Sequence, residues 1–340
     1  MSALRIEYRG GAICLPEIGL WMDSRAARKE GERVFVSHAH ADHLGRHKEV
    51  ILTDPTYRLM NARIGGSRLA SVLAYGEPAS FEHCGNVYRI TLYPAGHILG
   101  SAMALIEADG ETLLYTGDFK LSAGFACEPC EPVQADRLIM ETTFGKPHYR
   151  FPSRWETMES IIAFCSQTLK QGGTPMLLAY SLGKSQELLA GLAQANFPIV
   201  VHRTIDVMNA VYREFGRAFP QYDVLDNGAV AGKVLICPPN AKLPGNPRAS
   251  GRLNKAVITG WAIDRNCQYR SKADAAFPLS DHSDYDELVE FVRRVKPSRV
   301  YTTHGFACEF AWTLRDLGFN AQALGMQEQM TLALPGAYSD

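Results

Sequence analysis

The sequence predicts an α/β protein in which a strand-rich first part precedes a unit of alternating strands and helices. Short apolar segments separated by turn residues dominate positions 1 to 145, and few helical stretches occur there. After residue 146, segments with helical spacing alternate with short strands, a pattern typical of a parallel sheet. A third observation is that His and Asp residues repeatedly follow apolar, strand-like segments on both sides of this unit.

The strand-rich part contains the densest group of candidate metal ligands, the segment SHAHADH from Ser37 to His43. An apolar run at residues 34–36 precedes it, so we expect the segment where a buried strand ends and a loop begins. Side chains at i and i+2 of an extended chain point to the same side. Imidazole and carboxylate suit zinc, manganese or iron, and the density of ligands favours two ions over one. The four candidate ligands are His38, His40, Asp42 and His43.

Further candidate ligands follow other strand-like segments: His97 follows ITLY, Asp118 follows LLYTG and His304 follows RVYTT. The expected ligand sets are His38, His40 and His97 for one ion, Asp42, His43 and His304 for the other, and Asp118 as a bridge. A hydroxide between the ions is the expected nucleophile, because metal binding lowers the pKa of water to roughly 7. Two ions about 3.5–4 Å apart favour phosphodiester hydrolysis, without excluding hydrolysis of thioesters or lactams.

The alternating unit is predicted to span residues 146–259. Its first helix is predicted in WETMESIIAFCSQTLKQGG, where apolar residues at helical spacing indicate a face buried in the core and a glycine stands near the end. The segments that follow are the strand TPMLLAY, the helix KSQELLAGLA, the strand FPIVV, the helix TIDVMNAVYREFG and the strand VLICPP. Since His304 must return to the same metal site, we expect this unit to be an insertion into a domain formed by residues 1–145 and 260–340.

Two loops are candidates for binding substrate phosphate. The loop SLGK, residues 181–184, lies between a predicted strand and helix, where N–H groups, a hydroxyl and a lysine can hold phosphate; the alternative is a plain turn. Residues 227–263 include no acidic residue, and Pro, Gly and Asn predict a long loop there, either phosphate-binding or merely solvated. The candidate contacts are Ser181, Gly183, Lys184, Arg248, Arg252 and Ser283, with Gly100 and Ser101 as weaker ones.

These motifs resemble those of metallo-β-lactamase fold hydrolases, and more narrowly of β-CASP nucleases. The narrower resemblance rests on ETTFG from Glu141, LSDHSDYDELVEFV with His282, TTHG with His304, and the strand–loop–helix LLAYSLGKSQELL. ITGWA around Trp261 is similar to a segment of the Artemis-type DNA cross-link-repair exonucleases. The matches run from about residue 20 to about residue 305, and the layout looks most like that of bacterial DNA-ligase-associated exonucleases. The resemblance implies an αββα sandwich with an inserted α/β β-CASP domain.

The resemblance also implies roles for residues outside the metal ligands. His282 would be the general acid that protonates the leaving 3′ oxygen, and Glu141 would orient it; a helix-capping role is the alternative for His282. Asp23, in LWMDSR, looks like the family's early Asp that orients a metal-bound His, unless it is a turn residue. The candidate catalytic residues are therefore Asp42, Glu141 and His282. Asp284 and Glu287 form the pattern of a capping box at the start of YDELVEFVRRV.

The resemblance leaves DNA and RNA open as substrates. Artemis-type enzymes tend to carry an apolar residue where this chain has His304, whereas RNA-processing members usually carry His. The length and the GW segment favour DNA, so we expect a 5′-to-3′ exonuclease acting on single-stranded DNA in repair, with zinc or manganese. The alternatives are an RNA-processing nuclease, a small-molecule metallo-hydrolase and a non-catalytic scaffold. A DNA ligase or helicase is the partner that the family resemblance suggests.

Composition gives weaker constraints. The chain has 340 residues and a net charge of −1, so a phosphate-binding groove depends on local charge. No run of 18 apolar residues exists, and the start MSALRIEYRGG lacks the apolar region of a secretory signal, so we expect a cytoplasmic protein without a membrane span. The lone CEPC at 127–130 lacks the second pair that a structural zinc site needs, and a reduced compartment is expected for the eight cysteines.

Overall fold

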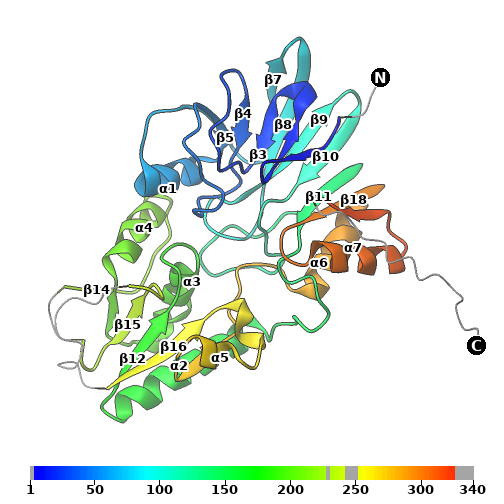
Figure 1. Ribbon diagram of the computed structural model, residues 1–340. Coiled ribbons are helices and arrows are strands. Elements are labelled where there is room, and N and C mark those ends of the chain that lie inside the picture. The colour runs from blue at the N-terminus through cyan, green and yellow to red at the C-terminus, as the bar shows by residue number, and fades with distance from the viewer. Residues whose placement is uncertain (1–3, 227–229, 242–251, 326–340) are drawn as a thin grey trace, which may run out of the picture.

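A computed structural model describes residues 4–226, 230–241 and 252–325 of the chain. Two lobes are visible in Figure 1: a sandwich of two sheets, and below it a smaller lobe with a third sheet. The predicted basic loop lies largely outside the described residues, and Arg248 is among those that are not described.

The first sheet of the sandwich comes from the N-terminal part of the chain. Its strands, in spatial order, are β1 (Glu7–Arg9), β2 (Ala12–Leu15), β3 (Leu20–Met22), β4 (Arg33–Phe35), β5 (Glu49–Leu52) and β6 (Leu69–Val72). From β3 onward the strands are parallel. Helix α1 (Asp54–Ile64), which begins after the N-cap Thr53, covers the outer face through Met60 and Tyr57.

The second sheet packs face to face with the first, and it includes strands that precede and strands that follow the smaller lobe in the sequence. Its order is β19 (Ala321–Ala323), β18 (Arg299–Thr303), β11 (Arg137–Glu141), β10 (Glu111–Tyr115), β9 (Ala102–Ala108), β8 (Asn86–Pro94) and β7 (Ala79–His83). Helices α6 (Tyr285–Val295) and α7 (Ala307–Asp316) bury their apolar faces on its outer side. These layers confirm the αββα sandwich. Helix α6 begins with a capping box of Asp284 and Glu287, as predicted.

The smaller lobe contains a parallel sheet, as the alternation of strands and helices predicted. Its strand order is β14 (Asp223–Val224), β13 (Ile199–Val201), β15 (Val234–Cys237), β12 (Thr174–Leu178), β16 (Leu253–Ile258) and β17 (Ala275–Phe277). One face packs against α2 (Arg154–Lys170), α3 (Lys184–Gly191) and α4 (Arg203–Glu214). The short elements are η1 (Pro16–Ile18), η2 (Ala193–Ala195), η4 (Gly260–Ile263) and α5 (Cys267–Arg270).

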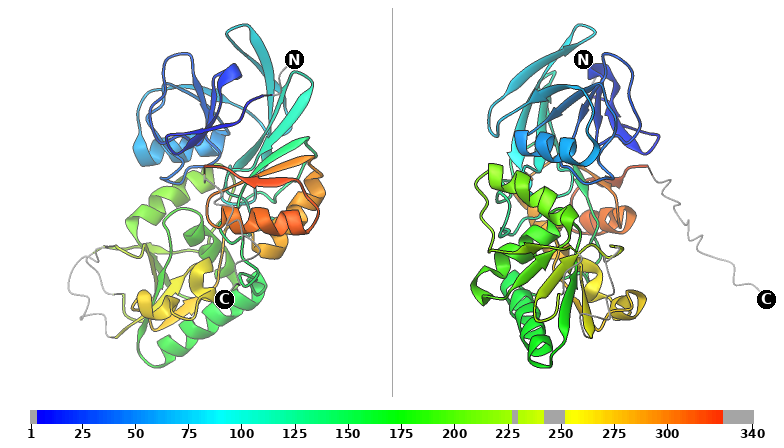
Figure 2. Two further views of the ribbon diagram at one scale, coloured as in Figure 1. Left: turned by 45° about the vertical axis from the view of Figure 1, so that its right-hand side comes forward. Right: turned by 90° about the vertical axis from the view of Figure 1, so that its left-hand side faces the viewer.

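The sheet of the smaller lobe continues beyond residue 259, where the sequence prediction ended the insertion. Strand β17 pairs in parallel with β16, with Ile258 opposite Phe277. The chain therefore returns to the sandwich only after Phe277, immediately before the segment that contains His282. Both views in Figure 2 show α1 of the sandwich close to α4 of the smaller lobe. An apolar cluster with Leu59 from α1 and Met208 from α4 joins the lobes at this point.

Candidate metal centre and cleft

The candidate ligands are brought together by strand ends. SHAHADH follows β4, Asp118 follows β10 and His304 follows β18, while His97 lies in the turn between β8 and β9. Strands β10, β11 and β18 are parallel neighbours, so their carboxyl ends lie at one edge of the sheet. That edge faces the smaller lobe.

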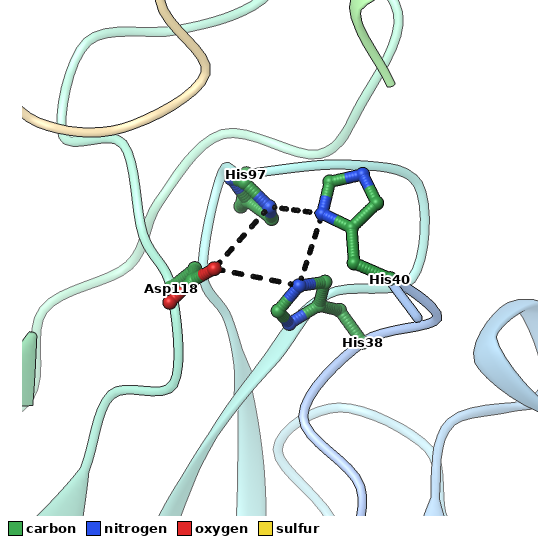
Figure 3. A group of neighbouring side chains, drawn as sticks. All are labelled: His38, His40, His97 and Asp118. Atoms are coloured by element: carbon green, nitrogen blue, oxygen red, sulfur yellow. Dashed lines mark hydrogen bonds and ion pairs between the residues drawn. The ribbon is translucent and has the colours of Figure 1, made fainter. Parts of the chain in front are cut away.

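Four of the predicted ligands form one compact, largely buried group: His38, His40, His97 and Asp118 (Figure 3). Their potential ligand atoms all lie within 4.8 Å of one another. His40 Nδ1 lies 3.1 Å from His38 Nε2 and 3.0 Å from His97 Nε2. Asp118 Oδ2 lies 3.5 Å from His38 Nε2 and 3.8 Å from His97 Nε2. These separations are near the roughly 3.3 Å that tetrahedral bonds of about 2.05 Å impose between ligands.

The nitrogens of His40 and His97 that point away from this group are held by main-chain carbonyls. His40 Nε2 lies 3.1 Å from the oxygen of Leu182, and His97 Nδ1 lies 2.8 Å from the oxygen of Asp281. A carbonyl only accepts, so each of these nitrogens carries the proton. The opposite nitrogen of each neutral ring therefore has a free lone pair directed into the group, as metal ligation requires.

His38 is oriented in the same way by a relay that begins at Asp23. Ser37 Oγ donates to Asp23 Oδ2 at 2.7 Å, so it accepts from His38 Nδ1, which lies 2.9 Å away. The Tyr115 hydroxyl also donates to Asp23 Oδ2, at 2.8 Å. Three imidazoles thus direct bare nitrogens at one point, a donor set that fits a divalent cation. Burial and the nearby His97 lower the pKa of His40 to about 3, which keeps that ring neutral.

The second predicted set is more open. His43 Nε2 lies 3.3 Å from Asp118 Oδ2, and His43 Nδ1 lies 3.0 Å from Asp23 Oδ2, so Asp23 is placed to orient His43. Asp42 Oδ2 lies 4.0 Å from His43 Nε2 on a half-exposed side chain. The His304 ring centroid lies 6.2 Å from that of His43. Asp42, His43 and His304 line the same cleft as His40 and Asp118. Asp118 Oδ2 lies close to both sets, since it is near His38 as well as His43.

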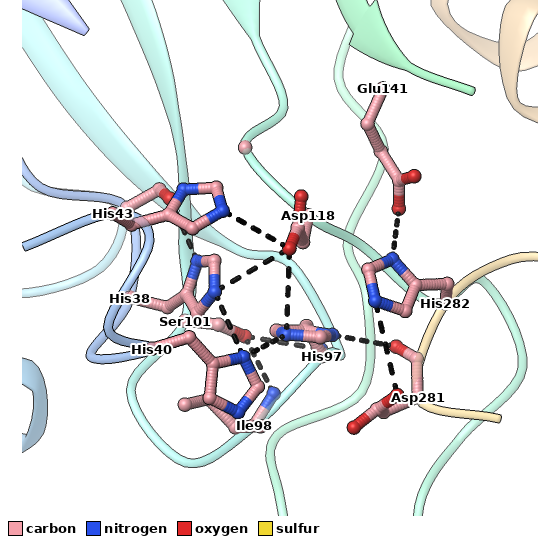
Figure 4. Close-up of polar contacts among 12 residues, drawn as sticks. His38, His40, His43, His97, Ile98, Ser101, Asp118, Glu141, Asp281 and His282 are labelled. Carbon is pink, nitrogen blue, oxygen red and sulfur yellow. Dashed lines mark hydrogen bonds and ion pairs between the residues drawn. The ribbon is translucent and has the colours of Figure 1, made fainter. Parts of the chain in front are cut away.

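His282 lies beside the compact group and is paired with Glu141, as Figure 4 shows. Its Nδ1 is 2.9 Å from Glu141 Oε1, and its ring centroid is 4.7 Å from that of His97. Glu141 is 2% exposed and also accepts N–H bonds from Phe119 and Thr143. Although burial disfavours the imidazolium, the carboxylates of Glu141 and Asp118 raise the pKa of His282 to about 9. An imidazole whose protonated form is favoured by two carboxylates therefore faces the cluster of candidate ligands.

Several known proteins have sequences similar to that of this chain. Residues 273–313 match the family model described as the Zn-dependent metallo-hydrolase RNA specificity domain. A probable DNA ligase of Opitutus terrae is 46% identical over 95% of this chain, and an RNase J-like protein of Methanocaldococcus jannaschii is 25% identical over 90%. The 5′ exonuclease Apollo of Gallus gallus is 28% identical over 83% of the chain.

The chain belongs to the metallo-β-lactamase/β-CASP nuclease family. It corresponds to only 31% of the length of the Opitutus protein, but to 89% of the RNase J-like protein and 60% of Apollo. A crystal structure of a protein of unknown function from Enterococcus faecalis V583 has a TM-score of 0.51 at 16% identity, covering 79% of this chain and 74% of that one. This likeness bears on the fold alone. Within the described residues, no helix combines the length and apolar character that a membrane span needs.

The smaller lobe contributes one wall of a cleft of about 540 Å³ that opens onto the candidate metal ligands. The predicted phosphate contacts Ser181 and Lys184 line it, but both already have partners. Ser181 Oγ lies 2.8 Å from Thr204 Oγ1. Lys184 is 5% exposed and forms an ion pair with Asp281. Gly183 fills a tight position, since a Cβ there would lie 2.4 Å from Ile98 Cγ2.

The remaining phosphate candidates that the structure describes lie outside the residues that line this cleft. Ser283 is buried, and its Oγ accepts from Leu121 N at 3.0 Å. Ser101 Oγ accepts from the main-chain N–H of His97, which shapes the ligand loop. Gly100 N donates to Glu128, and Arg252 is exposed at the start of β16.

Three cleft residues with suitable chemistry were given no functional role from the sequence. Arg63, near the end of α1, lines the cleft beside Asp42, and it belongs to no salt bridge among the described residues. Trp261 and Tyr180 also line it, and their side chains are partly or largely exposed. Arg63 had no local pattern to mark it. Trp261 stood in the ITGWA segment, whose similarity to repair exonucleases was the one available indication.

Proposed function

We propose that this chain is a dinuclear-metal phosphodiesterase that degrades single-stranded DNA from the 5′ end toward the 3′ end in DNA repair. The observation that carries the proposal is the His282–Glu141 pair beside the ligand cluster. A small metallo-hydrolase whose leaving group needs no proton has no use for a partly buried imidazole that a carboxylate partner favours in its protonated form. Cleavage of a phosphodiester does, because the leaving alkoxide must be protonated.

Each residue has a distinct part in this proposal. The three imidazoles of the compact group would hold one divalent ion together with Asp118. Asp42, His43 and His304 would complete the site for a second. Zinc, with manganese as the alternative, would supply Lewis-acid stabilisation of the phosphate charge and lower the pKa of water. His282 gives the Nε2 proton to the leaving oxygen, while Glu141 holds Nδ1 and stabilises the imidazolium. The matched family model is described as Zn-dependent, which supports the choice of metal.

DNA is favoured as the substrate by the name of one relative, and cleavage from the 5′ end by the name of another. The Opitutus terrae relative is named a probable DNA ligase, and the Gallus gallus relative is named a 5′ exonuclease. Because this chain corresponds to 31% of the Opitutus protein, the remainder of that protein is available for ligase activity. We therefore include a DNA ligase as the proposed partner of this chain, with a helicase as a second possibility.

RNA is the second candidate substrate, and a specific observation favours it. His304 is present and borders the cleft, and residues 273–313 match a model described as an RNA specificity domain. The RNase J-like relative from Methanocaldococcus jannaschii points the same way.

The test is cleavage of matched 5′-phosphorylated single-stranded DNA and RNA of one sequence, labelled at the 3′ end, with added zinc or manganese. A ladder of shortening labelled DNA beside intact RNA supports the proposal. Release of the label as a mononucleotide would indicate the opposite polarity, and cutting of circular single-stranded DNA would indicate endonuclease action. Preferential RNA cleavage would move the chain to the RNA-processing branch. A sample with EDTA controls for contaminating metal-independent activity, and a thioester such as S-lactoylglutathione tests the small-molecule alternative.

A further inference from the structure

Trp261 has an unusual position among the aromatic residues of the cleft. It lies in η4, between β16 and β17 of the insertion, and it is 38% exposed. It lines the same cleft as the metal ligands and His282. A large apolar ring that stays open to water beside a catalytic site is positioned for a ligand with a flat apolar face.

The ring of Trp261 is held firmly from behind by other aromatic rings. Its centroid lies 4.7 Å from that of Phe144, at 51°, and 5.5 Å from that of Tyr149, at 90°. Phe306 packs at 6.4 Å and 67°. Because these neighbours fix the indole before any ligand arrives, little side-chain entropy is lost when a ligand stacks on it.

The supporting rings come from segments that also carry the catalytic residues. Phe144 follows Glu141 by three positions, and its ring centroid lies 6.1 Å from that of His282. Phe306 follows His304 by two positions. Gly260 allows the close approach, since a Cβ there would lie 2.5 Å from Phe144 Cζ. The position of the indole relative to His282 is therefore fixed by their shared packing on Phe144.

The geometry points to Trp261 as a stacking platform for one nucleobase of the substrate, next to the nucleotide that is cleaved. This inference rests on the proposed function, because the stacked ring is a base of the same strand. The chemistry of the cleft fits a nucleic acid. Arg63, which forms no salt bridge among the described residues, can meet a backbone phosphate, and Tyr180, which is 62% exposed, supplies a second π surface. Stacking tolerates every base, as an enzyme without sequence preference requires.

The experiment compares the wild-type chain, Trp261→Ala and Trp261→Phe on one single-stranded oligonucleotide, intact or with a single abasic residue placed in turn at each of the first four positions. Stacking on a base is worth about 1–3 kcal/mol, so Trp261→Ala should lower kcat/KM on the intact strand about 5- to 150-fold. Trp261→Phe should retain most of the activity. One abasic position should slow the wild-type chain to the same degree, and Trp261→Ala should show no further loss on that strand.

Trp312→Ala is the matched control, because Trp312 is 50% exposed on α7 and does not line the cleft. It should leave kcat/KM unchanged. Bound zinc per chain and the pH profile should also be unchanged in Trp261→Ala, since a merely structural role for the indole would disturb His282 through Phe144. An equal loss on the intact strand and on every abasic strand would overturn the inference, and so would wild-type activity in Trp261→Ala.

Binding separates a failure of this inference from a failure of the proposed function. Fluorescence anisotropy of a labelled oligonucleotide is measured in EDTA, where no cleavage occurs. If Trp261→Ala binds the intact strand more weakly than the wild-type chain does, but binds the abasic strand equally well, the platform is supported. This holds even if the chain cleaves neither DNA nor RNA, and absence of cleavage would then refute the nuclease activity alone. Cleavage without any base-dependent difference would refute the platform alone.

Discussion

Replacing Lys184 with Met should destabilise the protein far more than removal of an ordinary lysine. Lys184 and Asp281 are 5% and 4% exposed, and their side chains form an ion pair across the junction between the insertion and the sandwich. Removing one partner leaves the other charge buried without compensation, which costs about 3–5 kcal/mol. His282 Nε2, 3.9 Å from Asp281 Oδ1, compensates only in part, so we expect a loss of about 3 kcal/mol.

Lys48 offers a matched control for the same substitution. It pairs with Glu30 at 3.1 Å, but the two side chains are 70% and 85% exposed. An exposed pair of this kind contributes about 0–1 kcal/mol. Lys48→Met should therefore leave stability almost unchanged, although it removes an ion pair of similar geometry.

The assay is urea unfolding at pH 7 in EDTA, followed by tryptophan fluorescence and circular dichroism, with coincident transitions as the test of two-state behaviour. The double variant Lys184→Met/Asp281→Asn should recover part of the loss, because no buried charge is left unpaired. A loss in Lys184→Met as small as that in Lys48→Met would refute the reasoning. So would a double variant no more stable than Lys184→Met alone.

Three further predictions concern the metal site. Asp118→Ala should abolish both the binding of two zinc ions and cleavage, because the carboxylate lies between the two ligand sets. Metal content and activity are measured on the same sample, and full activity would contradict the assignment. His282→Ala should slow cleavage by about 10²-fold or more while the metal content of the chain stays unchanged; loss of metal would make His282 a ligand. In Glu141→Gln the pKa of His282 should fall, because a neutral amide no longer favours the imidazolium, so the alkaline limb of the kcat profile should move to lower pH than in the wild-type chain.

The predictions from sequence were strongest where local chemistry decides structure. SHAHADH follows three apolar residues that form the end of a buried strand. This pattern does not depend on distant parts of the chain, so the position of the segment at the sheet edge could be predicted from local sequence. The capping box at Asp284 is local in the same sense. Helix α1 was missed although Thr53 and Pro55 marked its start, because only a few of its side chains are buried and the apolar period is weak. The three residues of β17 are too few to show alternation, which explains the misplaced end of the insertion.

Long-range partners could not be predicted in this way. Lys184 was a candidate phosphate contact, with a plain turn as the alternative, because N–H groups at a helix start beside a lysine can hold an anion. Its partner Asp281 is 97 residues away along the chain, and no local pattern connects the two. The aromatic support of Trp261 has the same character, since Phe144 and Phe306 are distant from it along the chain and contact it only in the folded structure.

The insertion also supplies part of the scaffold that orients the metal ligands. The carbonyl of Leu182, in the insertion, accepts from His40, and Lys184 anchors Asp281, whose carbonyl accepts from His97. The loop of residues 181–184 thus helps to fix the tautomer of His40 and His97, in which the nitrogen that faces the compact group carries no proton. If this loop moves, the ligands lose both orientation and proton placement, and outer partners of this kind typically change metal affinity by about 10- to 100-fold. Metal affinity should therefore report on how closely the two lobes are joined, and Lys184→Met should weaken zinc binding as well as stability.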